Sequence, residues 1–207
     1  MGDYKVVISR YDENIEWVKV FNDYVVYNKG NNVGISEEIL NRTYNLPNVG
    51  IDCDVILRYI TTHYYQLPRK IAFCQGRYDD HYNLSVSEFA YGLLTLDGGY
   101  SILDYSTENC FEQDINYPHF NIKEYRSNIV ENYQPDYDLQ TWWKQASGEE
   151  YVQNPVVFWG SIFCVDRDLI YRRSLPFYQK LHTYFTKYKK PVETHFLERT
   201  WANIFKI

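Results

Sequence analysis

The sequence lacks the features of membrane and secreted proteins. It contains no apolar run long enough to cross a bilayer, and its first residues lack the apolar core of a signal peptide. We therefore expect a cytoplasmic protein without a transmembrane segment, and we interpret the glycosylation sequons at Asn41 and Asn83 as chance matches. The four cysteines are far apart, without metal-ligand spacing, which predicts free thiols in a reducing compartment. They are Cys53, Cys74, Cys110 and Cys164.

Positive charge is also scarce. The 21 Lys and Arg residues are outnumbered by 27 Asp and Glu residues, which gives a formal net charge of −6. Nucleic-acid binding depends on clustered cations that neutralise phosphates, so this acidic balance excludes nucleic acid as a general partner. A single phosphate group can still be bound at a local site.

Three catalytic or cofactor motifs are missing. The Gly-x-Gly-x-x-Gly fingerprint does not follow the first apolar run, and the P-loop signature is absent from the chain. The Gly-x-Ser-x-Gly nucleophile elbow is absent too. These absences disfavour dinucleotide-dependent oxidoreductases, P-loop kinases and α/β-hydrolases.

What the sequence does contain is enough apolar residues for one buried core. Its length of 207 residues and hydrophobic fraction of 45% predict a single domain over residues 1–207. The 22 tyrosines are unusual. They are interpreted either as half-buried side chains whose hydroxyl groups contact solvent or as aromatic faces that bind bases and sugar rings.

Hydrophobic patterning predicts an α/β fold. The first 80 residues alternate strand, helix, strand, helix and strand, which is typical of a parallel sheet with crossover helices. Residues 97–140 show no clear period. The predicted strands are residues 6–8, 23–27, 70–74, 155–160 and 161–165. The predicted helices are residues 15–21, 52–65, 85–94, 139–146 and 175–188, with a short helix from Asp166 through Ile170 and a last helix opened by Pro191.

Three polar loops follow the first three predicted strands. They are residues 9–12, 28–30 and 75–81, and ligands of parallel sheets bind beyond the carboxyl ends of the strands. Arg10 and Lys29 are suited to phosphate or ribose, and Tyr11 to stacking on a base. The three loops together suit a nucleotide diphosphate with a divalent metal ion.

The acidic pair Asp79-Asp80 is a candidate metal site. Carboxylate oxygens are preferred by Mg²⁺ and Mn²⁺, which bridge them to substrate phosphates. The same residues also suit a solvated turn. His195 is a third candidate ligand, with a structural histidine as the alternative. Glu193 is a candidate general base, with a first-turn carboxylate favoured by the helix dipole as the alternative.

The opening segment resembles the first strand and loop of GT-A glycosyltransferases. Family-two members often carry Val-Val-Ile-Pro-x-Tyr-Asn-Glu where this chain has Val6-Val7-Ile8-Ser9-Arg10-Tyr11-Asp12-Glu13. The chain also resembles a GT-A-related family of fungi, bacteria and large DNA viruses, and it looks like a capsid-glycan glycosyltransferase domain of a large algal (chlorella) virus. The matching segments span most of the chain. They are residues 9–11 with Trp17, 27–30, 46–50, 73–76, 163–167 through 176–178, and 197–201 with Ile204 and Phe205.

This resemblance implies a GT-A-like, nucleotide-diphospho-sugar transferase fold, with a mixed, mostly parallel central sheet flanked by helices. It implies a UDP-sugar donor, Mn²⁺ or Mg²⁺, a glycan or glycoprotein acceptor and, for a viral protein, the host cytoplasm. Residues 1–82 would be the nucleotide-binding half and residues 83–207 the acceptor and catalytic half. The family's Asp-x-Asp motif at the strand end is replaced here by Cys74-Gln75-Gly76, with Asp79-Asp80 slightly later.

The sequence therefore predicts a metal-assisted glycosyltransferase with Glu193 as the catalytic carboxylate. Two alternatives stay open, namely a non-catalytic carbohydrate- or nucleotide-binding module and a metal-dependent phosphodiesterase or nuclease. A sugar-stacking surface is also expected from Trp142, Trp143 and Trp159. The predicted metal ligands are Asp79, Asp80 and His195. The predicted nucleotide-sugar-binding residues are Ser9, Arg10, Tyr11, Asn28, Lys29, Gly50, Asp52, Arg58, Gln75, Gly76 and Arg77.

Overall fold

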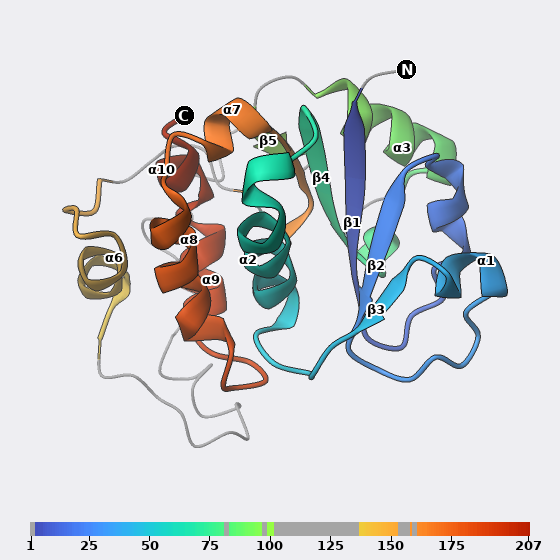
Figure 1. Cartoon of the computed structure of the whole chain (residues 1–207), viewed down its shortest axis with the longest axis horizontal. Coiled ribbons are helices and arrows are strands. Elements are labelled where there is room, and N and C mark those ends of the chain that lie inside the picture. The colour runs from blue at the N-terminus through green and yellow to red at the C-terminus, as the bar shows by residue number, and fades with distance from the viewer. Residues whose placement is uncertain (1–2, 81–82, 97–98, 102–136, 153–157, 159–160) are drawn as a thin grey trace.

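A mixed β-sheet forms the centre of the protein (Figure 1). The computed structural model describes residues 3–80, 83–96, 99–101, 137–152, 158 and 161–207. Within them, six strands are hydrogen-bonded in the order β3-β2-β1-β4-β6-β5. The strands are β1 (Tyr4–Arg10), β2 (Tyr24–Asn28), β3 (Thr43–Asn45), β4 (Lys70–Gln75), β5 (Gly99–Ser101) and β6 (Phe163–Asp166).

Most of the sheet is parallel. Strands β2 and β4 flank β1 in parallel register, and β3 continues the parallel set beyond β2. Strand β6 runs antiparallel to both β4 and β5. The predicted α/β class, with a mixed and mostly parallel sheet flanked by helices, is therefore confirmed.

The apolar run of β1 is buried on both sides because helices cover both faces of the sheet. Successive side chains of a strand point to opposite faces. Val7 accordingly packs into one hydrophobic cluster, whereas Val6 and Ile8 pack into the other.

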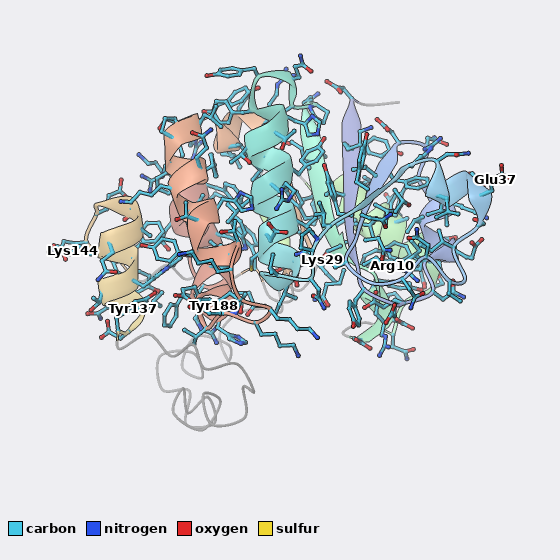
Figure 2. All side chains as sticks on the ribbon, turned by 60° about the horizontal axis from the view of Figure 1, so that its bottom comes forward. Arg10, Lys29, Glu37, Tyr137, Lys144 and Tyr188 are labelled. Atoms are coloured by element: carbon cyan, nitrogen blue, oxygen red, sulfur yellow. The ribbon has the colours of Figure 1, made fainter. Side chains whose placement is uncertain are left out.

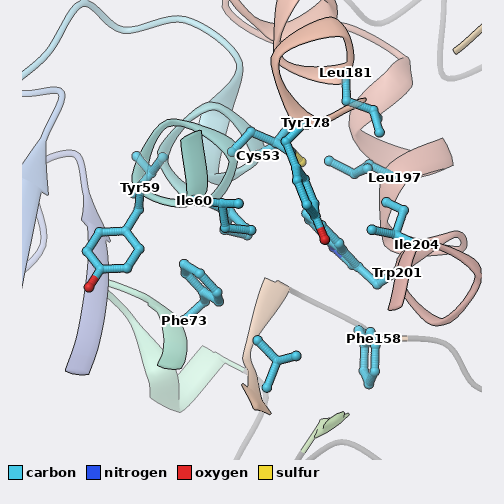
Figure 3. Packing of buried hydrophobic residues seen from close by; sticks show 14 of the residues in the cluster. Cys53, Tyr59, Ile60, Phe73, Phe158, Tyr178, Leu181, Leu197, Trp201 and Ile204 are labelled. Carbon is cyan, nitrogen blue, oxygen red and sulfur yellow. The ribbon is translucent and has the colours of Figure 1, made fainter. Parts of the chain in front are cut away.

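One face of the sheet is covered by α2 and the C-terminal helices. Aromatic rings fill this larger cluster, and Figure 3 shows part of their packing. Phe163 lies with its ring centroid 5.1 Å from that of Phe158 and 5.2 Å from that of Trp201. The helices are α2 (Ile51–His63), α6 (Leu139–Ser147), α7 (Arg167–Ile170), α8 (Leu175–His182), α9 (Glu193–Glu198) and α10 (Trp201–Phe205), with 3₁₀ turns η2 (Tyr64–Gln66) and η5 (Thr183–Phe185).

The opposite face is covered by shorter elements from the first half of the chain. Trp17 is central there, with its ring in edge contact with Tyr78 and Phe89. Ser85 and Glu88 form a reciprocal capping box that fixes the start of α3. The elements are η1 (Glu16–Val20), α1 (Glu37–Leu40), η3 (Tyr78–Asp80) and α3 (Val86–Thr95).

Several predicted boundaries differ from the structure. The predicted helix over residues 15–21 is a 3₁₀ turn, and α1 and β3 lie in a segment predicted as loop. The predicted helix over residues 175–188 ends at His182, and the last predicted helix is two, α9 and α10. Predicted strand residues 155–157 and 159–160, and most of residues 97–140, lie outside the described residues.

The predicted sugar-stacking surface of tryptophans is wrong for the two that are described. Trp142 and Trp143 are buried between α6 and its neighbours, because the apolar face of this amphipathic helix packs into the core. Trp159 lies outside the described residues. The thiols of Cys53, Cys74 and Cys164 are buried and form no disulfide bond, and Cys110 lies outside the described part of the chain. None of the described helices combines the length and apolar character needed to cross a membrane.

The aromatic cluster around Phe163 generates a stability prediction. Replacing Phe163 with Ala removes a ring that contacts Phe73, Phe158 and Trp201, and we expect the free energy of unfolding to fall by about 3–5 kcal/mol. Urea unfolding followed by tryptophan fluorescence measures this change. Val33→Ala, at a side chain that is 80% exposed, is the control, with an expected change within about 0.5 kcal/mol. Equal stabilities of the two variants would contradict this description of the core.

Candidate functional site

A pocket of about 100 Å³ lies at the carboxyl ends of the parallel strands. It forms there because the register places Ser9 of β1 beside Tyr27 of β2 and Gln75 of β4, so that the three following loops meet. Figure 2 shows Arg10 and Lys29 at this end of the sheet. The lining residues are Ser9, Arg10, Tyr11, Glu13, Lys29, Asn48, Ile51, Asp52, Gln75 and Gly76.

Seven of the predicted nucleotide-sugar-binding residues are among those that line the pocket. The structure thus brings together the strand-end loops that the sequence analysis selected. Four other predicted residues are not in the lining. They are Asn28, Gly50, Arg58 and Arg77.

Arg10 holds the loops around the pocket in place. Its side chain is buried, and its guanidinium donates five hydrogen bonds within the protein. Burial lowers the pKa of Arg10, although the nearby carboxylates of Glu13 and Asp12 act in the opposite direction. We correct the predicted role from phosphate binding to loop positioning, because the guanidinium is engaged by protein acceptors. These are the carbonyl oxygens of Tyr11, Glu13, Asn31 and Val33 and the amide oxygen of Asn28.

Asn28 belongs to the same buried hydrogen-bond network as Arg10. Its amide oxygen accepts from the Arg10 Nη1 at 2.7 Å, and its amide nitrogen donates to the Gly30 carbonyl at 3.0 Å and to Asn45 Oδ1 at 3.2 Å. Gly30 must remain small, since a Cβ there would lie 1.8 Å from the Tyr11 carbonyl oxygen. Asn28 is fully buried, so its role is to position the loops rather than to contact a ligand.

Lys29 is bound to a buried carboxylate behind the pocket. Its ammonium lies 2.9 Å from Asp54 Oδ2 and also donates to the carbonyls of Val49 and Ile51. Burial lowers the pKa of Lys29, against the opposing charge of Asp54. An ammonium has three donors, and three protein oxygens surround this one. The predicted role of Lys29 in binding phosphate is therefore replaced by a structural one.

Asp54 also contacts Arg58 and His182. Arg58 Nη2 lies 2.9 Å from Asp54 Oδ1. The predicted ligand-binding residue Arg58 lies further along α2 than Ile51 and Asp52 and is outside the pocket lining. His182 Nε2, from α8, lies 2.7 Å from the same oxygen. Burial alone would raise the pKa of Asp54, but the hydrogen bond to His182 and the charges of Lys29 and Arg58 lower it below its ordinary value.

The start of α2 lies at the pocket. Gly50 is left-handed, with φ of 64°, and a Cβ there would lie 2.2 Å from the Phe185 carbonyl oxygen. Ile51 follows with φ of 46°, a strained value for a β-branched residue, and its carbonyl is held by Lys29. No side chain of the N-cap residue caps the helix, and its first two residues, Ile51 and Asp52, line the pocket. The positive end of the helix dipole therefore lies at the pocket.

A lysine-bearing loop beside α2 was missed by the sequence analysis. The Tyr188 carbonyl accepts a hydrogen bond from the Gly50 N–H at 2.8 Å, and Lys189 Nζ lies 5.4 Å from the centroid of the Tyr11 ring. Lys187 and Lys190 of the same loop are exposed. The sequence analysis predicted a helix that continues to Tyr188. The lysines that follow residue 186 could have indicated a basic loop instead.

Asp52 is the carboxylate that the structure places most favourably for proton transfer. It lines the pocket and is hydrogen-bonded by Ser161, which has φ of 54°. Burial raises the pKa of Asp52, and the Glu198 carboxylate raises it further, against the hydrogen bond from Ser161 and the charge of Lys29. Burial also raises the pKa of the adjacent Cys53 thiol, which keeps it protonated. A carboxylate with a raised pKa in a pocket is a candidate general base.

Glu193, the predicted catalytic carboxylate, does not reach this pocket. It is fully buried on the inner face of α9, where its Oε1 accepts a hydrogen bond from the Tyr137 hydroxyl. The prediction placed it at the start of a helix but did not determine which face it occupies. The helix turns Glu193 into the core, whereas Glu198 lies near Asp52.

The predicted metal ligands do not form one group. Asp79 and Asp80 lie exposed on the turn η3, where Asp80 pairs with the exposed side chain of Arg77 at 3.4 Å. His195 Nδ1 lies 3.7 Å from Glu198 Oε2 on α9. Among the described residues, no three His, Cys, Asp or Glu side chains are arranged to share a metal ion. These residues alone therefore do not fit a protein-built metal centre.

Comparison with known proteins adds no relative. No family model, curated protein or solved structure matches this chain. The function is therefore inferred from the geometry of the site and from the resemblance described above.

The Asp54 network generates a prediction on stability and pH. Asp54→Asn leaves the buried Lys29 without its counter-charge, and we expect the free energy of unfolding at neutral pH to fall by about 3–5 kcal/mol. The folded pKa of Asp54 is lowered. Its stabilisation is therefore complete above the unfolded pKa of about 3.9 and is lost as the pH falls through the folded value.

Urea unfolding at neutral pH and at about pH 3 tests this expectation. The difference in stability between wild type and Asp54→Asn should shrink in acid. Asp168→Asn, at a side chain that is 91% exposed, is the matched control and should change little at either pH. A difference between wild type and Asp54→Asn that does not depend on pH would contradict the ionised state of Asp54.

Proposed function

We propose that this protein is a glycosyltransferase that moves a sugar from a UDP-sugar donor to a glycan hydroxyl. One observation carries the proposal. A pocket at the carboxyl ends of parallel strands combines the exposed ring of Tyr11, the uncapped start of α2 and the carboxylate of Asp52. Each element suits one requirement of the reaction. The Tyr11 ring would stack on the nucleotide base, the start of α2 would hold the diphosphate, and Asp52 would accept the proton of the acceptor hydroxyl.

The donor would lie across the rim of the pocket. At about 100 Å³ the pocket is smaller than the usual range for ligand sites, about 300–1,000 Å³, so only part of a nucleotide sugar fits inside it. Tyr11 is 45% exposed and offers a face for uracil. The α2 N-terminus and Lys189 supply positive potential for the diphosphate. Arg10 and Asn28 act indirectly, by fixing the loop that carries Tyr11.

Asp52 would act on the acceptor. The acceptor hydroxyl attacks the anomeric carbon, the bond from that carbon to the UDP oxygen breaks, and the hydroxyl proton passes to the Asp52 carboxylate. UDP leaves with the electron pair of the broken bond. Dipole and lysine charge at the start of α2 stabilise the negative charge on the leaving diphosphate.

A divalent cation stays a prediction from the sequence and from the resemblance. Mn²⁺ or Mg²⁺ would neutralise the diphosphate, but the described side chains do not build a centre for it. We therefore assign no step of the reaction to a metal ion. The Asp79-Asp80 pair remains the candidate that its position on a strand-end loop nominates.

A non-catalytic nucleotide- or carbohydrate-binding module is the second candidate. The small pocket and the engagement of Arg10 and Lys29 by protein acceptors favour it. A module would bind UDP or a UDP-sugar without releasing UDP in the presence of acceptors. Hydrolysis of the donor without an acceptor would instead indicate the phosphodiesterase alternative.

Calorimetric titration with UDP tests the binding part of the proposal. Tyr11→Ala removes the stacking face and is expected to weaken UDP about tenfold or more. Tyr91→Ala, at a tyrosine of α3 that is 74% exposed, is the matched control and should bind as wild type does. Repeating the titration with Mn²⁺, and with an Asp79→Ala/Asp80→Ala variant, tests the metal assignment. Absence of UDP binding under every condition would refute the transferase proposal, and metal-dependent binding that survives in the double variant would refute the acidic pair.

Release of UDP from a panel of UDP-sugars, with oligosaccharide acceptors present, tests the role of Asp52. Asp52→Asn is expected to reduce turnover by about 10²–10⁴-fold while UDP affinity is kept. Because the pKa of Asp52 is raised, wild-type turnover should fall as the pH is lowered through that value. Glu150→Gln, at an exposed carboxylate outside the pocket, is the control. Full turnover in Asp52→Asn would exclude Asp52 as the base.

A further inference from the structure

A second and larger cavity lies at the other end of the sheet. Its volume is about 560 Å³, within the range of about 300–1,000 Å³ that is usual for small-molecule sites. We name it the tyrosine groove. It is lined by Asp3, Lys5, Val25, Tyr44, Tyr59, His63, Tyr65, Gln66, Leu67, Pro68, Arg167 and Tyr171.

The groove is separate from the candidate pocket. Lys5 lies near the amino end of β1, and Arg10 at its carboxyl end lines the candidate pocket. The five residue steps from Lys5 to Arg10 span roughly 17 Å. The two cavities share no lining residue among those described. A ligand in the tyrosine groove would therefore not occupy the donor site.

Aromatic faces form the walls of the groove. Tyr65 is 80% exposed, Tyr44 is 61% exposed and Tyr171 is 41% exposed. The floor is built from buried Val25, Leu67 and Tyr59; Figure 3 shows the Tyr59 ring extending away from the other labelled core side chains. Aromatic side chains carry a large apolar area that favours burial and stacking. Because these tyrosine rings are exposed, their flat faces are open to stacking with a ring-shaped ligand.

Neighbouring contacts support the positions of these walls. The Tyr44 ring is stacked on Tyr27 with centroids 5.7 Å apart, and the Tyr171 ring lies 5.2 Å from that of Tyr64. Tyr64 is in turn anchored by its hydroxyl, which donates to the Arg173 carbonyl at 2.5 Å. The walls are therefore supported from behind before any ligand binds, which lowers the entropic cost of binding.

The charges around the groove are balanced. Lys5 forms an ion pair with Asp23, and Arg167 lies 3.9 Å from Asp3 while also donating to the Leu67 carbonyl. A nucleotide or phosphorylated ligand would need excess positive charge, which these pairs do not provide. Gln66 and His63 add polar groups that suit hydroxyls. A neutral, hydroxyl-rich ligand with flat apolar faces matches this lining better than an anion does.

We propose that the tyrosine groove is a binding site for a neutral oligosaccharide, distinct from the candidate transfer site. The sugar rings stack on Tyr65 and Tyr171, and their hydroxyls exchange hydrogen bonds with Gln66 and His63. This proposal goes beyond the transferase reaction and does not depend on it. A groove of this kind would hold a glycan on the protein whether or not that glycan is the acceptor.

Saturation-transfer-difference NMR with five neutral trisaccharides tests the proposal. The probes are maltotriose, cellotriose, N,N′,N″-triacetylchitotriose, mannotriose and xylotriose, each added to the full chain. We expect at least one of them to receive saturation, and a Tyr65→Ala/Tyr171→Ala variant to weaken its binding about tenfold or more, measured by calorimetry. Both side chains project from the surface, and a thermal unfolding midpoint close to wild type would establish that the double variant is folded.

Two controls make the outcome specific. Tyr91→Ala removes a tyrosine of similar exposure outside the groove and should leave trisaccharide binding unchanged. Tyr11→Ala, in the candidate pocket, should also leave it unchanged. The proposal is overturned if none of the five trisaccharides binds, if binding persists in the double variant, or if Tyr11→Ala abolishes it. UMP serves as an anionic competitor. Displacement of the trisaccharide from the groove by UMP would overturn the claim that the ligand is neutral.

Discussion

The buried carboxylate of Asp54 is the interaction on which the site depends. It joins Lys29 after β2, Arg58 within α2 and His182 at the end of α8. A charge in that position is tolerated only because its partners are in place. Among these partners Lys29 lines the candidate pocket, and Asp54 and Arg58 belong to α2, whose first residues line it. The position of α2 relative to the sheet, and with it the position of Asp52, therefore follows from this network.

Internal hydrogen bonds explain why the two basic residues that line the pocket are not assigned as its ligand-binding groups. Arg10 and Lys29 are saturated by protein oxygens, so they provide rigidity rather than free charge. In the proposed function, positive potential at the rim comes instead from the α2 N-terminus and from Lys189. A preorganised wall of this kind favours binding because little has to be ordered when a ligand arrives.

The sequence predicted the architecture better than the roles of single residues. The alternation of apolar runs identified the parallel strands, and the strand-end rule found the loops that line the pocket. It did not find β3, whose three residues are too short to show a period. It also failed for Glu193 and Lys29, because burial and hydrogen-bond partners depend on residues far away in the chain, such as Tyr137 and Asp54. Metal binding, by contrast, stays a prediction from the sequence and from the resemblance.

The pairing of β6 with β4 has a consequence for any study of ligands. It places a strand from the second half of the chain inside the sheet, and the loop around Tyr188 closes onto Gly50 from the first half. The two halves therefore cannot melt independently without opening the candidate pocket. A compound that binds there selects the folded form of the whole chain by mass action. An increase in melting temperature then reports occupancy directly, even for a donor whose sugar is unknown.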